Sequence, residues 1–89
     1  MELNVAATLR IMPTDAGVDL DPIKDALEEI VKDLGRIHTI EVKPIAFGLN
    51  SLEVVILLND SAGGMEEVES GVKKLDGVGS VEVIDVNRL

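Results

Sequence analysis

Four short segments of the chain have the hydrophobic pattern of β-strands. In residues 4–12 the positions alternate so that one side of the segment is uniformly apolar. The residues on that side are Val5, Ala7, Leu9 and Ile11. Pro13 ends this predicted strand, and a turn-rich link at residues 14–17 follows it.

The other three predicted strands differ in how much of their surface is apolar. Residues 38–43 alternate until Pro44 interrupts the pairing, which favours an edge position. Residues 52–58 follow a reversal at Asn50 and Ser51 and are apolar on both faces, which is typical of a central strand. Residues 81–86 form the fourth strand, but its inward face is ambiguous because neither alternation is wholly polar.

Two segments repeat apolar residues with the period of an α-helix. Residues 20–34 carry one apolar stripe, with Asp19 or Asp21 as the cap, and Gly35 is expected to end this helix in a left-handed conformation. Residues 64–75 carry the second stripe, which opens near residues 61–64 and closes at Asp76-Gly77. The stripes consist of Ile23, Ala26, Leu27, Ile30, Val31 and Leu34, and of Met65, Val68, Val72 and Leu75.

The resulting order, β-α-β-β-α-β, predicts a ferredoxin-like α+β fold. Right-handed crossovers place both helices on one face of a four-stranded antiparallel sheet, with the first and third strands at its centre. The other face is expected to be less polar than a purely solvated surface, as a docking site or as a weakly apolar face. It would carry Ala6, Thr8, Met12, Val55 and Leu57.

Composition and charge bound the domain and the kind of partner. With 89 residues, 46% of them hydrophobic and Phe47 the only aromatic, we expect residues 1–89 to form one domain with an aliphatic core. A net charge of −9 repels nucleic acids and anionic membranes, which favours a protein partner, although an acidic surface also serves solubility alone. Without cysteine, signal peptide or membrane span, a cytoplasmic protein is expected.

Few residues suit covalent catalysis or metal binding. His38 is the single histidine and has no cysteine to share a metal with. Gly63-Gly64 lacks the lysine and spacing of a phosphate-binding loop, so a helix-entry turn is favoured. The pairs Glu28-Glu29 and Glu66-Glu67 diverge by roughly 100° on a helix surface and cannot jointly grip a substrate. The residues therefore favour a binding or regulatory module.

Two stretches, Lys43–Leu49 and Leu75–Leu89, resemble elongation factor 1-beta, particularly its short archaeal form. Ile11-Met12-Pro13 and Val18-Asp19-Leu20 also match, so the resemblance covers nearly the whole chain. It implies a guanine-nucleotide exchange domain, here alone, that binds the GTPase elongation factor 1-alpha and speeds release of GDP. It also implies neither covalent chemistry nor a cofactor held by this chain, because magnesium belongs to the partner's nucleotide site.

The resemblance assigns partner contacts to Phe47 and Gly48 and to Arg88 and Leu89. Phe47 matches the aromatic of a loop that inserts against the GTPase near its nucleotide site, although a lone phenylalanine is otherwise usually core. Arg88 aligns with a terminal basic residue, lysine in eukaryotic members, that acts on the magnesium region. Arginine keeps the charge but is broader and planar, so general electrostatic disruption is expected rather than displacement of magnesium. A solvated tail is the alternative for this terminus.

Two other functions fit the same pattern. An ACT-like domain that binds a small metabolite shares the order of elements, and it would be stabilised by its ligand without affecting GDP release. A structural assembly subunit would associate stably with a partner and have neither activity.

Overall fold

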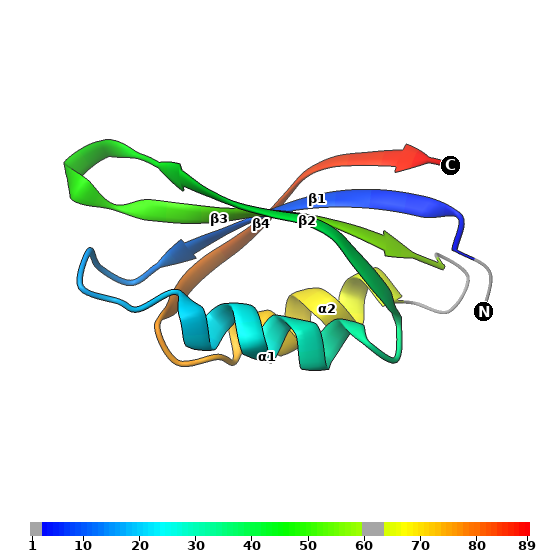
Figure 1. Cartoon of the computed structure of the whole chain (residues 1–89), viewed down its shortest axis with the longest axis horizontal. Helices are drawn as coiled ribbons and strands as arrows, with labels where there is room; N and C mark the ends of the chain where they lie inside the picture. Colours follow the sequence, from blue (N-terminus) through cyan, green and yellow to red (C-terminus); the bar gives the residue numbers. More distant parts are fainter. Residues whose placement is uncertain (1–2, 60–63) are drawn as a thin grey trace.

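A computed structural model of the chain describes residues 3–59 and 64–89. Two α-helices lie on one side of a four-stranded sheet, which confirms the predicted ferredoxin-like α+β fold (Figure 1). The elements are β1 (Val5–Pro13), α1 (Asp21–Val31), β2 (Gly35–Pro44), the short 3₁₀ turn η1 (Ala46–Gly48), β3 (Asn50–Leu58), α2 (Gly64–Lys73) and β4 (Val78–Arg88).

The sheet has the order β2-β3-β1-β4, and all three pairings are antiparallel. The expected neighbourhood of the first and third strands is therefore confirmed, with Val5 opposite Leu58 and Ile11 opposite Leu52. β2 and β4 are the edge strands, as predicted for residues 38–43. Both helices lie on the same face of the sheet, so no helix of the described residues covers the second face (Figure 1).

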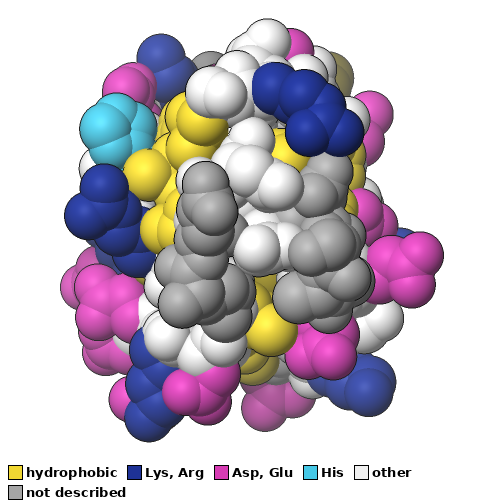
Figure 2. Space-filling view, turned by 90° about the vertical axis from the view of Figure 1, so that its right-hand side faces the viewer, with side chains coloured by type: hydrophobic (Ala, Val, Ile, Leu, Met, Phe, Trp, Pro, Cys, Tyr) yellow, Lys and Arg dark blue, Asp and Glu magenta, His cyan; other side chains and the backbone are white. Residues whose placement is uncertain are grey.

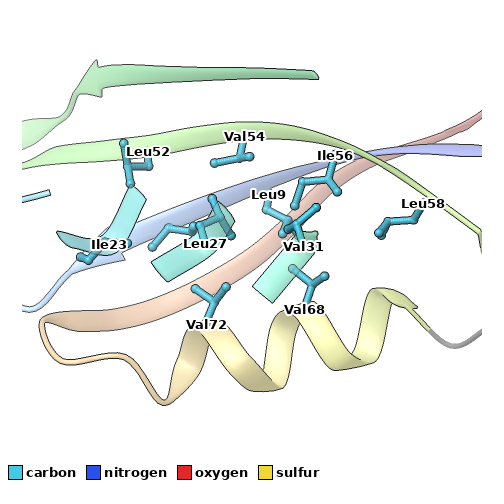
Figure 3. Close-up of a cluster of buried hydrophobic side chains, with 11 residues drawn as sticks. Leu9, Ile23, Leu27, Val31, Leu52, Val54, Ile56, Leu58, Val68 and Val72 are labelled. Carbon is cyan, nitrogen blue, oxygen red and sulfur yellow. The ribbon is translucent and has the colours of Figure 1, made fainter. Parts of the chain in front are cut away.

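The core between the two layers is aliphatic, as the composition predicts. β1 and β3 direct alternate residues toward the helices, and the apolar stripes of α1 and α2 pack against them (Figure 3). The buried cluster consists of Leu9, Ile11, Ile23, Leu27, Val31, Leu52, Val54, Ile56, Leu58, Val68 and Val72. Burial of a single side chain of this size contributes about 1.5–3 kcal/mol, so this cluster is the main source of stability.

A register shift in β4 resolves the ambiguity of its inward face. Val83 lies opposite Leu9 and Asp85 lies opposite Thr8, so Ile84 is the extra residue between the two pairs. The extra residue reverses the alternation, as a β-bulge does. Val86 consequently shares the inward face with Val83, although the two residues are separated by an odd number of positions.

Three local predictions need correction. α1 ends at Val31 rather than near residue 34, because β2 already begins at Gly35. Among the described glycines, only Gly48 and Gly77 have a positive φ, so the expected left-handed stop at Gly35 is wrong. The reversal before β3 occurs at residues 45–49, since Ser51 is already paired with Lys43. Most of the predicted opening of the second helix, residues 61–63, lies outside the described residues.

Gly35 is required for a different reason, which a substitution can test. A Cβ atom at this position would collide with the backbone oxygen of Leu57 in the paired strand. We expect Gly35→Ala to lower the free energy of unfolding by about 1–3 kcal/mol in urea denaturation, because backbone must move. The control is Gly71→Ala in α2, where the nearest atom belongs to the flexible Ile30 side chain at 3.2 Å. Equal stability of both variants would contradict this role.

Candidate functional site

The loop between β2 and β3 is a tight turn held by two backbone hydrogen bonds. The N–H of Ile45 donates to the carbonyl of Leu49 at 2.8 Å, and the N–H of Leu49 donates to the carbonyl of Ala46 at 3.3 Å. Between them Phe47 has φ 62° and ψ 31°, and Gly48 has φ 75°. The left-handed region suits glycine but costs a phenylalanine about 1–3 kcal/mol. The loop therefore holds Phe47 in a strained conformation.

The Phe47 side chain is 97% exposed, more than any other large hydrophobic side chain that the structure describes. The alternative of a buried core phenylalanine is therefore wrong. An aromatic ring of this size gains free energy from burial, so its full exposure at the tip of a fixed turn is typical of a residue that contacts a partner. Strain and exposure at the same residue make it the strongest candidate contact of the molecule.

A shallow groove of about 550 Å³ lies beside the Phe47 ring. Its walls come from the loop and from the strand ends on the face of the sheet without helices. The lining residues are Arg10, Met12, Ile45, Ala46, Phe47, Leu49, Ser80 and Glu82. Arg10 and Glu82 form an ion pair at 3.8 Å across β1 and β4, and this pair leaves the groove nearly neutral at one end.

The base of the same hairpin carries a cation that stays charged. The Lys43 ammonium lies 3.1 Å from the Glu41 carboxylate. This hydrogen bond, together with the charges of Glu41 and Glu53, raises the pKa of Lys43 above its ordinary value. A raised lysine pKa favours the folded state below the ordinary value, and the effect is lost only as the pH rises through the folded-state pKa. Lys43 is thus positively charged at neutral pH.

The other predicted contacts lie at the end of β4, where the backbone is ordered by pairing. Arg88 is the last residue of β4 and lies opposite Val5 of β1. Beyond it, the N–H of Leu89 donates to the carbonyl of Asn4 at 3.0 Å. The terminal backbone is therefore paired rather than frayed, although Leu89 is 69% exposed. A cavity of about 350 Å³ lies beside Arg88, between Val5, Leu58, Met65 and Val86.

The structure does not bring the two groups of predicted residues together. The molecule measures 39 × 21 × 16 Å, and the Phe47 loop and the C-terminus lie at opposite ends of its longest axis (Figure 1). Along β1, Arg88 is level with Val5 and the loop end of β3 is level with Ile11. Six residues of strand correspond to about 20 Å before the loop itself is counted. Phe47 with Gly48, and Arg88 with Leu89, are two separate surfaces.

The remaining chemistry of the described residues is sparse. Acidic and basic side chains are interspersed at the C-terminal end of the molecule, with hydrophobic side chains visible between them (Figure 2). His38 is exposed in β2 beside a register shift. Within residues 3–59 and 64–89, no three His, Asp or Glu side chains are placed to hold a metal ion. No helix of these residues is long and apolar enough to cross a membrane.

Sequence reasoning missed one exposed apolar surface, on β4. Val83, Ile84 and Val86 are 37%, 39% and 53% exposed on this edge strand. The signal was present in residues 81–86, where both alternations carry apolar residues although an edge strand has only one face to bury.

Comparison with known proteins gives consistent matches over nearly the whole chain. Residues 6–89 match the family described as the EF-1 guanine nucleotide exchange domain. Elongation factor 1-beta of Methanothermobacter thermautotrophicus is 38% identical, and the match covers 97% of each chain. The protein of the same name from Methanobrevibacter smithii is 42% identical, with 96% of each chain covered.

A likeness to one solved structure concerns the fold alone. The ACT domain from the GTP pyrophosphokinase of Chlorobium tepidum superposes with a TM-score of 0.65. The match covers 91% of this chain and 99% of that domain, at 17% sequence identity.

The conformation of Phe47 leads to a stability prediction. We expect Phe47→Gly to raise the free energy of unfolding by about 1 kcal/mol, because glycine relieves the left-handed strain. Phe47→Ala should change it by less than about 0.5 kcal/mol, since the ring makes little contact with the core. Urea denaturation of both variants gives the measurement. A loss of about 3–5 kcal/mol in Phe47→Ala would instead indicate a buried ring.

Proposed function

The chain belongs to the elongation factor 1-beta family of translation elongation factors, which carry the guanine nucleotide exchange domain, and on this premise we propose that it promotes exchange of GDP for GTP on elongation factor 1-alpha. It does so by binding that GTPase and disturbing its nucleotide and magnesium site. The observation that carries the proposal is the fully exposed, strained Phe47 at the tip of the β2–β3 loop.

The separation of the two surfaces gives the proposed complex its geometry. Arg88 and the Phe47 loop are more than about 20 Å apart along the sheet, so only one of them reaches the nucleotide site. We assign this role to Arg88, which carries the positive charge suited to a magnesium and phosphate environment. Phe47 and Gly48 then contact a second part of the same GTPase. This changes the expectation that the Phe47 loop lies near the nucleotide.

Arg88 acts through its charge and its fixed position in this proposal. A guanidinium brought close to the magnesium site disturbs the electrostatics of the phosphate and carboxylate oxygens there, without having to replace the metal. The pairing of β4 with β1 and the bond from Leu89 to Asn4 hold the arginine at the end of the sheet, so little ordering entropy opposes docking. Leu89 adds an exposed aliphatic contact beside it.

Exchange of this kind needs no covalent step. An exchange protein that binds the nucleotide-free GTPase more tightly than the GDP-bound form lowers the affinity of the GTPase for GDP to the same extent. This follows because coupling between two ligands is reciprocal. Residues 1–89 constitute one exchange domain in this proposal. The chain itself holds no cofactor, since magnesium and nucleotide belong to the partner.

The deciding experiment is the release of a fluorescent GDP analogue from the matching elongation factor 1-alpha, with and without the chain. Faster release at substoichiometric amounts of the chain supports exchange activity. Unchanged release, together with a small metabolite that raises the melting temperature of the isolated chain, would favour the ACT-like alternative. Stable binding without faster release would favour an assembly subunit.

We expect Phe47→Ala to slow GDP release by roughly tenfold or more at a fixed concentration of the chain, because an exposed aromatic anchor is lost. The chain concentration at half-maximal release should rise while the melting temperature stays near that of the wild type. Val42→Ala, on the outer edge strand β2, is the matched control for removing an exposed apolar side chain. Normal release by Phe47→Ala would remove the loop from the interface.

For Arg88, charge and shape can be separated. We expect Arg88→Ala to slow GDP release and Arg88→Glu to slow it further, whereas Arg88→Lys keeps substantial activity if charge is what matters. Each variant is measured at several magnesium concentrations, with circular dichroism as the control for folding. Unchanged release by Arg88→Ala across that series, with normal binding of the GTPase, would exclude the proposed role.

A further inference from the structure

We propose that the free edge of β4, between the Phe47 loop and Arg88, is a docking surface for the GTPase. The GTPase would contact the strip formed by Val83, Ile84 and Val86. The inference rests on the proposed function and names the surface through which the partner binds. β4 pairs with β1 on one side only, because it is the last strand of the sheet.

Exposed aliphatic side chains are concentrated on this edge. Among the large hydrophobic residues that are exposed in the described chain, Val83, Ile84, Val86 and Leu89 lie on or directly after β4. The other two are Phe47 in the loop and Val42 on β2. The strip does not serve the core, since Val78 and Val81 near the start of β4 pack against the core cluster, whereas Val86 is 53% exposed.

The strand that carries the strip reaches both candidate surfaces, and the strip itself adjoins the cavity beside Arg88 on the helix side of the sheet. The groove beside Phe47 is lined by Ser80 and Glu82, which lie near the start of β4 and face the side of the sheet without helices. The cavity beside Arg88 is lined by Val86, near the end of the same strand. A partner that binds at both the groove and the cavity can contact the exposed edge of β4 between them, because this strand contributes residues to both.

Charge and strand geometry favour the GTPase over a second copy of the chain as the occupant. Each copy carries a net charge of −9, and Glu82 and Asp85 flank the strip, so two copies repel each other along this edge. The extra residue Ile84 also breaks the regular spacing of backbone groups that strand addition requires. The edge therefore suits side-chain docking by a partner that offers apolar groups flanked by cations.

Two edge valines provide a matched test. Val86 and Val42 lie on the opposite edge strands β4 and β2, both on the inward face, and are 53% and 45% exposed. We expect Val86→Asp to raise the chain concentration at half-maximal GDP release by roughly tenfold, which corresponds to about 1.4 kcal/mol of binding free energy. Val42→Asp should change it by less than about twofold. Melting temperatures of both variants are measured alongside.

Amide hydrogen exchange in the complex of the wild-type chain with the GTPase gives an independent measurement. It does not depend on whether a variant folds. Amides of residues 81–86 should gain protection when the GTPase binds, whereas those of residues 38–42 should not. If the wild-type chain accelerates GDP release, either of two results would overturn the inference alone. These are equal effects of the two valine variants on GDP release, or no added amide protection in residues 81–86. A wild-type dimer in light scattering that Val86→Asp dissociates would overturn it as well. Failure of the wild-type chain to accelerate GDP release would overturn the proposed function and this inference together.

Discussion

The structure depends on the burial of one face of the sheet by aliphatic side chains alone. Leu9 and Val54 on the central strands meet Leu27 and Val68 from the two helices, and no aromatic ring takes part. In a chain of this length one such layer is the only core available. The single aromatic residue is therefore not needed inside, and it is free to stand in solvent at the tip of the β2–β3 loop.

The separation between a buried aliphatic core and exposed strand ends explains where the candidate sites lie. Rigid strands paired over many residues carry the loop at one end of the sheet and Arg88 at the other. The loop stores strain at Phe47, which persists because the flanking hydrogen bonds and the paired strands determine its backbone. Both sites are thus held in place before binding, which lowers the entropy that docking must overcome.

The edge strands show a second consequence of having a single core layer. A register shift lies in each of them, near His38 in β2 and at Ile84 in β4, and each lets residues of odd spacing share the inward face. On β2 the exposed positions are mostly charged or polar, as expected for a protected edge. On β4 they include three aliphatic residues, a departure from the local rule that is typical of a functional surface.

The sequence by itself determined the order of the elements, the adjacency of the first and third strands and the aliphatic core, because these follow from the period of apolar residues and the handedness of crossovers. It also determined the loop at Phe47 and the terminal Arg88 as candidates, through the family resemblance. Only the tertiary structure decided that Phe47 is exposed, that Arg88 lies at the opposite end and that β4 inserts an extra residue. These depend on the register between strands distant in the sequence. The same holds for Gly35, where glycine is required by the Leu57 carbonyl in the neighbouring strand and not by the end of the preceding helix.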